Sequence, residues 1–230
     1  MALNISSLER SNLAESVSDL LRESIVNGQI TPGTHLIEAE IAKQLNVSRG
    51  PLREAFRILE KEGLLDNRPG RGSYVSQPSE RYIKEAYSLR SVLEIEAFRL
   101  AINKRTEEDL GRLENTLEEM FNAAKSGDER DVLRLDIAFH RMIWGIADHR
   151  LIQASLEAII TRLKMYIAVQ TKIYDDLLKG IADHRIILDA LRSRNEERGI
   201  EALKQHLQLA IEMVLKYFVH SDGDEPKLTG

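Results

Sequence analysis

The sequence predicts a mainly α-helical protein, in which short helices and a small β-hairpin come first and an all-α bundle of six helices follows. Four of the five prolines fall within the first 78 residues, where the predicted elements are short. Between Ser79 and His220 there is no proline, and apolar residues recur at helical spacing almost throughout. The chain therefore divides near Pro78 into two parts of different construction.

We assign residues 1–76 to a first domain, 77–79 to a linker and 80–220 to a helical domain. The remaining residues, 221–230, are mostly polar, and we expect a disordered tail there. In the first domain, apolar spacing predicts three helices, over 13–26, 38–45 and 51–62. The Asn27-Gly28 pair ends the first of these helices, Ser48 is placed to cap the start of the third, and Gly63 is placed to end it.

A β-hairpin is predicted after the third helix. Two short runs, 64–66 and 73–76, flank the turn Arg68-Pro69-Gly70-Arg71-Gly72, which gives the hairpin a basic tip. Two short helices joined by a tight turn and followed by such a hairpin form a winged helix-turn-helix. In the helical domain, Thr106 with Asp109 resembles a capping box. The six helices predicted there span approximately 80–103, 106–125, 128–147, 150–173, 175–194 and 196–219.

Composition excludes several classes of protein. The chain has 230 residues and no cysteine, which rules out disulfides, cysteine-ligated zinc and thiol chemistry and favours an intracellular protein. No apolar run approaches the roughly 20 residues that span a bilayer. The N-terminus lacks the basic flank and apolar segment of a secretory signal. We therefore expect a cytoplasmic protein with no membrane partner.

Positive charge is concentrated in one short stretch of an otherwise acidic chain. The net charge is −5, but residues 43–71 hold seven basic and four acidic side chains. Such a local footprint is typical of a DNA-reading element, in which the second helix of a helix-turn-helix places its N-terminal residues against base edges. Here the residues at that helix start are Ser48, Arg49, Gly50 and Arg53.

These residue types suit contact with DNA. Arg49 and Arg53 are four residues apart and share a helix face, and a guanidinium can bond guanine or a phosphate. Ser48 and the free N–H groups at the helix start can hold a phosphate, and Gly50 permits close approach. Arg71 at the hairpin tip would enter the neighbouring groove. The alternative is a merely solvated helix face and loop, but the ordered combination of helix, turn, helix and basic hairpin favours DNA.

An ordered pattern of residues runs through 10–76: Gly28, Ile30, Pro32, Gly33, Leu36, Ile41, Ala42, Leu45, Val47-Ser48-Arg49, Pro51-Leu52-Arg53-Glu54-Ala55, Leu59, Gly63-Leu64, Gly70-Arg71-Gly72 and Val75. This pattern resembles the GntR family of bacterial regulators. The resemblance implies that double-stranded operator DNA is contacted by Ser48, Arg49, Gly50, Arg53, Gly70 and Arg71. The chain departs from the family at Ala39, where some members carry a DNA-contacting Arg, and at Gly50, where Thr is common.

Three histidines and one aspartate of the helical domain are predicted to point inward. Asp136 and His140 share an apolar helix face, and His184 and His206 each lie in the apolar stripe of their own helix. A buried carboxylate is costly unless it is paired or bound to a metal, and imidazole with carboxylate oxygen suits a first-row divalent ion. The four are therefore candidate metal ligands. The alternative is a buried Asp–His network without metal.

Arg90 also lies on an inward stripe, beside Glu94. The sequence supports two interpretations equally. The two residues could form an Arg90–Glu94 ion pair along the helix, or Arg90 could be a cationic anchor for an anionic effector. Arg90-x3-Glu94, Asp136-x2-Phe139-His140, His184 and His206 together resemble the FCD effector domain of the FadR subfamily of GntR regulators, in its shorter, VanR-like version.

The FCD resemblance implies a helical bundle with an internal cavity, in which Asp136, His140, His184 and His206 bind an ion, often zinc or nickel. It also implies a small carboxylic or sugar acid as effector, completing the coordination sphere beside Arg90 and Glu94. Because one winged helix covers only a half-site, we expect a homodimer on a pseudo-palindromic operator. Repression that is relieved by the effector is the direction of regulation we expect, although the sequence does not determine it. A metal-dependent hydrolase is disfavoured because no separate general base or His-Glu-x-x-His motif is evident. A metal-free helical interaction protein is the second rival.

Overall fold

The structure is a computed structural model, and it describes all residues except 1–4, 78, 174–176 and 222–230. Among the residues it describes, side chains are placed except at 5–11, 165–173, 177–180, 213 and 216–221. The predicted tail falls almost wholly outside these residues. The chain divides into two compact units, residues 1–78 and 79–230.

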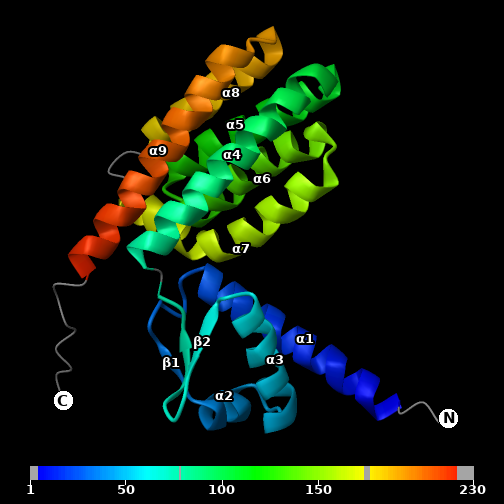
Figure 1. The fold of residues 1–230 in the computed structure, drawn as a ribbon, viewed down its shortest axis with the longest axis vertical. Helices are drawn as coiled ribbons and strands as arrows, with labels where there is room; N and C mark the ends of the chain where they lie inside the picture. Colours follow the sequence, from blue (N-terminus) through cyan, green and yellow to red (C-terminus); the bar gives the residue numbers. More distant parts are fainter. Residues whose placement is uncertain (1–4, 78, 174–176, 222–230) are drawn as a thin grey trace. The chain divides into compact units, whose positions relative to one another are not determined.

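The first unit contains helices and a small antiparallel sheet (Figure 1). Its described elements are α1 (Ile5–Val26), β1 (His35–Leu36), α2 (Glu38–Gln44), α3 (Arg49–Lys61), β2 (Leu65–Arg68) and β3 (Gly72–Val75). The strands lie in the order β1-β3-β2, so the predicted hairpin of β2 and β3 is joined by a third strand. The sequence did not predict β1, because two residues are too short to show an alternating pattern. The winged helix-turn-helix prediction is confirmed.

Helix α3 is held by one apolar face. Its buried residues are Pro51, Leu52, Ala55, Phe56 and Leu59, and it packs against α1, α2 and β2. Arg22 of α1 donates through Nε and Nη2 to the two carboxylate oxygens of Glu62, each at 2.7 Å, just after the end of α3. A bidentate pair of this kind fixes the orientation of the two groups as well as the distance between them. The opposite face of α3 is therefore presented to solvent in a defined orientation.

The second unit is the predicted bundle of six helices, and this prediction is confirmed for the described residues. The helices are α4 (Glu80–Lys104), α5 (Glu107–Ser126), α6 (Glu129–Ala147), α7 (Arg150–Ile173), α8 (Leu177–Ser193) and α9 (Glu196–Ser221). Helix α4 packs against α6, α7, α8 and α9, while α5 packs against α6 and α8 (Figure 1). Side chains from α4, α6, α8 and α9 can therefore meet inside the bundle.

The helix ends follow the sequence signals. The Thr106 hydroxyl accepts a hydrogen bond from the Asp109 amide, and the Asp109 carboxylate accepts one from the Thr106 amide at 2.9 Å. This reciprocal pair is the predicted capping box at the start of α5. Gly127 ends α5 at a φ of +74°, a left-handed conformation that favours glycine.

Helices α4 and α9 approach closely at Gly199. A Cβ built at this position would lie only 2.1 Å from Cζ of Phe98, and the Phe98 side chain is fully buried. Any other residue type there would force the buried Phe98 ring or one of the two helices to shift. Since His206 lies seven residues further along α9, this contact also helps to set the position of that imidazole.

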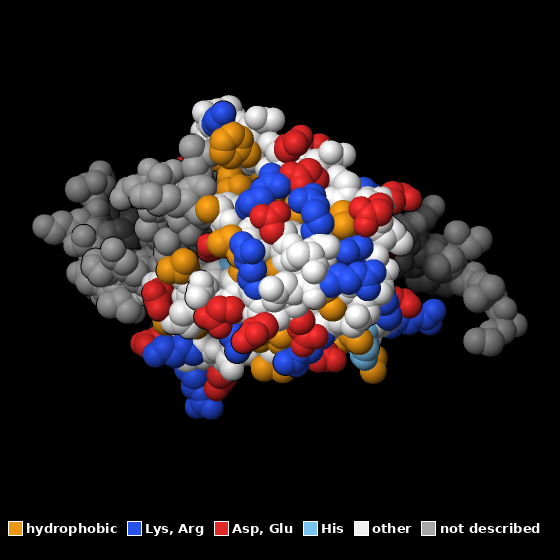
Figure 2. All heavy atoms as spheres, turned by 90° about the horizontal axis from the view of Figure 1, so that it is seen from above, with side chains coloured by type: hydrophobic (Ala, Val, Ile, Leu, Met, Phe, Trp, Pro, Cys, Tyr) orange, Lys and Arg blue, Asp and Glu red, His pale blue; other side chains and the backbone are white. Residues whose placement is uncertain are grey.

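The surface carries charges of both signs. Figure 2 shows acidic and basic side chains interspersed over the face that it presents. Such mixing gives no broad field of a single sign on that face. Among the described residues, no helix is long and apolar enough to cross a bilayer.

We expect Gly199→Ala to lower the free energy of unfolding by about 1–3 kcal/mol, because the added methyl group has no room beside Phe98. Gly111→Ala on α5 is the matched control, since nothing lies within 4 Å of a Cβ at that position. The control should raise stability by about 0.5–1 kcal/mol through helix propensity. Urea unfolding followed by circular dichroism measures both changes. Equal effects of the two substitutions would contradict the close approach of α4 and α9.

Candidate nucleic-acid interface and candidate metal centre

The first turn of α3 has an exposed side, and this side carries the residues predicted to meet DNA. Ser48 is the N-cap residue, but its side chain makes no capping hydrogen bond. Arg49 and Gly50 are exposed, and Arg49 forms no hydrogen bond or ion pair through its side chain within the described part of the chain. The Arg53 Nε atom donates to Oε2 of Glu38 at 2.8 Å, and the Arg53 side chain is 59% exposed. Arg53 is thus held in place, and Arg49 is left available.

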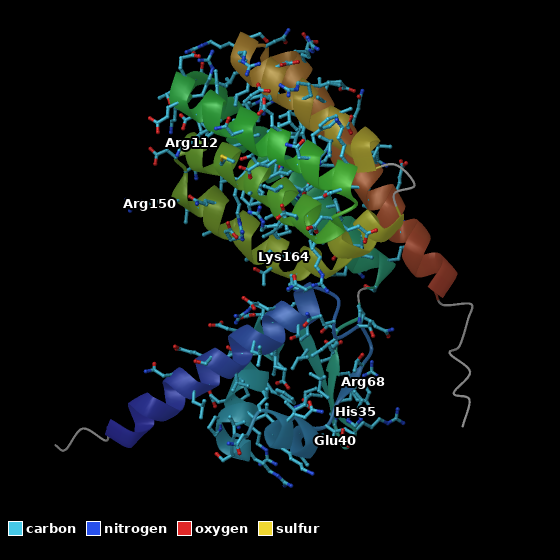
Figure 3. The ribbon with its side chains drawn as sticks, turned by 180° about the vertical axis from the view of Figure 1, so that it is seen from behind. His35, Glu40, Arg68, Arg112, Arg150 and Lys164 are labelled. Atoms are coloured by element: carbon cyan, nitrogen blue, oxygen red, sulfur yellow. The ribbon has the colours of Figure 1, made fainter. Side chains whose placement is uncertain are left out.

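The wing carries a stacked aromatic and cationic surface. The Arg68 guanidinium lies 4.2 Å from the centroid of the Tyr74 ring, and His35 stacks on the same ring at 4.5 Å. Figure 3 shows His35 and Arg68 close together on the first unit. Gly70 and Arg71 lie in the exposed connection that follows Arg68, where Gly70 has a φ of +74°. The stacking of Arg68 and His35 on Tyr74 therefore stabilises the sheet that carries the basic tip.

The structure brings together all four predicted metal ligands. Asp136 and His140 come from α6, His184 from α8 and His206 from α9. One ligand atom from each side chain lies within 4.8 Å of all the others. The three histidines are buried, and the Asp136 side chain is 18% exposed. This arrangement converts four separated sequence positions into one compact set of nitrogen and oxygen donors.

Contacts inside the cluster suit a shared cation. His184 Nε2 lies 2.9 Å from Asp136 Oδ1, and the Nε2 atoms of His140 and His206 face each other at 3.2 Å. Two imidazole nitrogens at that distance repel when both present lone pairs, so either a proton or a metal ion must lie between them. Three imidazoles and one carboxylate are a donor set that zinc or nickel accepts. The residues present therefore fit a divalent ion.

Glu94 connects this cluster to Arg90. Its carboxylate accepts a hydrogen bond from Arg90 Nε at 2.5 Å through Oε1, and Oε2 lies 2.7 Å from His140 Nδ1. Burial alone would raise the pKa of the Glu94 carboxyl, but Arg90 and His140 outweigh burial and lower that pKa to about 2. An ionised Glu94 is an acceptor for the Nδ1 proton of His140. The Nε2 atom of His140 is then the ring nitrogen that faces the cluster, where it could bind a metal ion.

Two further groups in the cluster are in the protonation states that bind metal. Burial lowers the pKa of His206 to about 4, with His184 acting in the same direction, so the imidazole is neutral at neutral pH. Burial would raise the pKa of Asp136, but the hydrogen bond with His184 and the charges of the imidazoles lower it below its ordinary value. Metal ligands of these types must be deprotonated, and both groups are.

Sequence reasoning missed two residues beside the cluster. Asp183 Oδ2 lies 3.8 Å from His206 Nδ1. Tyr87 is buried on α4, one turn before Arg90, and burial raises the pKa of its hydroxyl to about 12, so the hydroxyl keeps its proton. An aromatic residue on an apolar stripe is indistinguishable from core in the sequence. The three-residue spacing from Tyr87 to Arg90 was the available signal.

The remaining histidines lie outside the cluster as far as the structure describes them. His35 stacks on the wing sheet, and His149 is an exposed residue whose Nδ1 accepts a hydrogen bond from the Ile152 amide at 3.2 Å. The side chain of His220 lies outside the described residues. His149 thus satisfies a free amide at the start of α7.

Two family models match the chain. Residues 13–75 match the bacterial regulatory proteins of the gntR family, and residues 85–209 match the FCD domain. The chain is 33% identical over 203 residues to the HTH-type transcriptional repressor RspR of Escherichia coli K12, which covers 87% of this chain and 88% of that protein.

A second relative and a solved structure agree with these matches. The chain is 34% identical over 220 residues to the probable D-xylose utilization operon transcriptional repressor of Paenarthrobacter nicotinovorans, covering 94% and 93% of the two chains. Its fold is similar to that of McbR/YncC from E. coli, with a TM-score of 0.77, 23% identity and coverage of 90% and 98%. These relatives are regulators rather than enzymes.

We expect Zn²⁺ to raise the melting temperature of chelator-treated protein, because an ion that binds only the folded form adds about 2.7 kcal/mol at 100 times its Kd. His184→Ala removes a donor and should abolish both this shift and the stoichiometric ion found by elemental analysis. His149→Ala is the control and should keep both. Retention of the ion by His184→Ala would contradict the metal assignment.

Proposed function

We propose that this chain, which belongs to the gntR family of bacterial regulatory proteins and carries an FCD domain, is a homodimeric transcriptional repressor. Its affinity for the operator would be controlled by a small anionic effector that binds at a divalent metal ion. The family and its relatives make the chain a DNA-binding transcriptional regulator. The cluster of Asp136, His140, His184 and His206 is the observation that supports a metal ion and an effector in the helical domain. The FadR-subfamily and VanR-like assignments stay predictions.

For the DNA half, we assign base and phosphate contacts to the exposed start of α3 and to the wing. The residues are Ser48, Arg49, Gly50, Arg53, Gly70 and Arg71. Arg49 carries the main base contact in this proposal, because its guanidinium has no competing carboxylate. Arg53 is braced by Glu38 and still presents Nη donors. A regulator of this kind works in the cytoplasm, where the operator is.

The homodimer follows from the geometry of recognition. A single winged helix covers one half-site, and two copies related by a two-fold axis cover a pseudo-palindrome. Leu89 and Val92 lie about one turn apart on α4 and are 51% and 63% exposed. An apolar pair on an exposed helix face supports an additional contact between the two copies.

The charges inside the bundle support an anionic effector. The charges of the buried pair Arg90 and Glu94 cancel, and Asp136 is the one carboxylate among the four candidate ligands. A divalent ion held by Asp136 and three imidazoles would keep part of its positive charge at the site, since Asp183 faces His206 Nδ1 at 3.8 Å and is not among those ligands. Buried net charge is costly, so a carboxylate on the effector would complete the balance. The bound ion would supply a positive charge that attracts the effector carboxylate, and Arg90 and Glu94 would line the effector site.

Effector binding controls operator affinity only if the two conformations of the protein bind the effector unequally. The effector would sit where α4, α6, α8 and α9 meet, so its entry changes the packing of all four helices. We propose that this repacking lowers operator affinity. Repression would then be relieved when the acid accumulates.

We expect Arg49→Ala to weaken binding to a duplex selected from a random pool by at least tenfold, because each copy loses a contact worth about 1–3 kcal/mol. Lys61→Ala is the matched control, a cation at the other end of the same helix, and should change affinity less than threefold. Fluorescence anisotropy at fixed salt measures both variants. Arg49→Ala should keep its metal content. Loss of the ion instead of loss of DNA binding would contradict the division of roles between the two units.

We expect metal-loaded protein to bind D-xylonate and D-gluconate but not D-xylose and D-glucose. Each acid differs from its aldose chiefly at C1, so the pairs test the carboxylate alone. Calorimetry should show binding of the acids that disappears after chelation. Equal binding of acid and aldose, or acid binding that survives chelation, would contradict the effector proposal.

A further inference from the structure

Tyr87 carries a buried hydroxyl whose proton has no acceptor in the described part of the chain. The residue is 3% exposed, and the neighbouring guanidinium of Arg90 can donate to its Oη atom but cannot accept its proton. A buried donor left unpaired destabilises a fold, and such groups are uncommon. The arrangement indicates an acceptor that the described residues do not supply.

The surroundings of Tyr87 indicate the chemistry of that partner. The guanidinium carbon of Arg90 lies 5.8 Å from the centroid of the Tyr87 ring. Arg90 donates to Glu94 through Nε, which leaves its Nη groups for the Tyr87 hydroxyl and for a further acceptor. The helix therefore presents a hydroxyl and guanidinium N–H groups side by side, all of them donors.

A set of donors on α4 fits one kind of group. A carboxylate oxygen accepts from an O–H and an N–H at the same time, and hydrogen bonds to an ionised acceptor are the strong ones. Arg90 is connected to the cluster through Glu94, whose Oε2 atom lies 2.7 Å from His140 Nδ1. A group bound there would lie between the donors of α4 and the candidate metal ligands of α6.

We propose that Tyr87 is an effector-contacting residue, whose hydroxyl and the Nη donors of Arg90 together hold a carboxylate oxygen of the anionic effector beside the cluster. This inference rests on the proposed function and adds to it a residue that decides between acids and neutral sugars. Tyr87 also explains why an arginine already paired with Glu94 can still select an anion. The Tyr87 hydroxyl adds a donor beside the Arg90 guanidinium, which already donates to Glu94.

Tyr87→Phe in the full-length, zinc-loaded protein tests the proposal, with D-xylonate as the probe and calorimetry as the measurement. The variant should bind D-xylonate about 10- to 100-fold more weakly, the loss expected for one hydrogen bond to a charged group. Tyr82→Phe is the control on the same helix, where the tyrosine is half-buried, and should bind within twofold of the wild type. Ion content and affinity for the selected duplex without ligand should match the wild type in both variants.

A second measurement separates ligand contact from a structural role. Without ligand, Tyr87→Phe should melt at or above the wild-type temperature, because it removes a buried O–H that has no acceptor among the described residues. A lower melting temperature, or equal D-xylonate affinity in Tyr87→Phe and wild type, would overturn the inference. If the zinc-loaded wild type binds no acid of the tested pairs, the proposed effector function falls and this inference falls with it.

Discussion

Charges buried inside a helical bundle must be partnered, and Glu94 is the residue through which this chain meets that constraint. Its two carboxylate oxygens face Arg90 on the same helix and His140 on α6. Without Glu94, the guanidinium of Arg90 would be an uncompensated buried charge, which is strongly destabilising. The same carboxylate orients the imidazole of His140, so the stability of the bundle and the geometry of the candidate metal centre depend on one side chain.

The convergence of four helices gives the cluster its shape. Donors arrive from α6, α8 and α9, while α4 contributes the charged pair that supports them. The close contact between Gly199 and Phe98 lets α9 lie against α4, and His206 follows two turns later. Small shifts of one helix would therefore change distances between donors. A site of this kind can couple ligand occupancy to helix packing, because packed cores respond in discrete steps.

Much of the fold could be predicted because its signals are local. Periodic apolar residues gave the six helices of the bundle, and the capping box at Thr106 was visible as a short motif. Strand β1 could not be predicted, because its two residues pair with β3 through contacts distant in sequence. The inward direction of Asp136 and the histidines followed from spacing along single helices.

The remaining features of the site depend on contacts between helices. Neither the link from Glu94 to His140 nor the proximity of Asp183 to His206 is encoded in a spacing. Tyr87 has the sequence context of an ordinary core aromatic, and it is distinguished by a buried O–H with no acceptor among the described residues. Such features require the register of one helix against another, which apolar periodicity does not specify.

The absence of sulfur from the donor set has a consequence for a cell under oxidative stress. Peroxide converts thiolates stepwise to sulfenic and sulfinic acids, and a thiolate-ligated sensor loses its ion in that way. Imidazole and carboxylate groups do not enter that series, and the chain has no cysteine elsewhere. A regulator with these ligands would continue to respond to its effector under conditions in which oxidants inactivate regulators that depend on thiols.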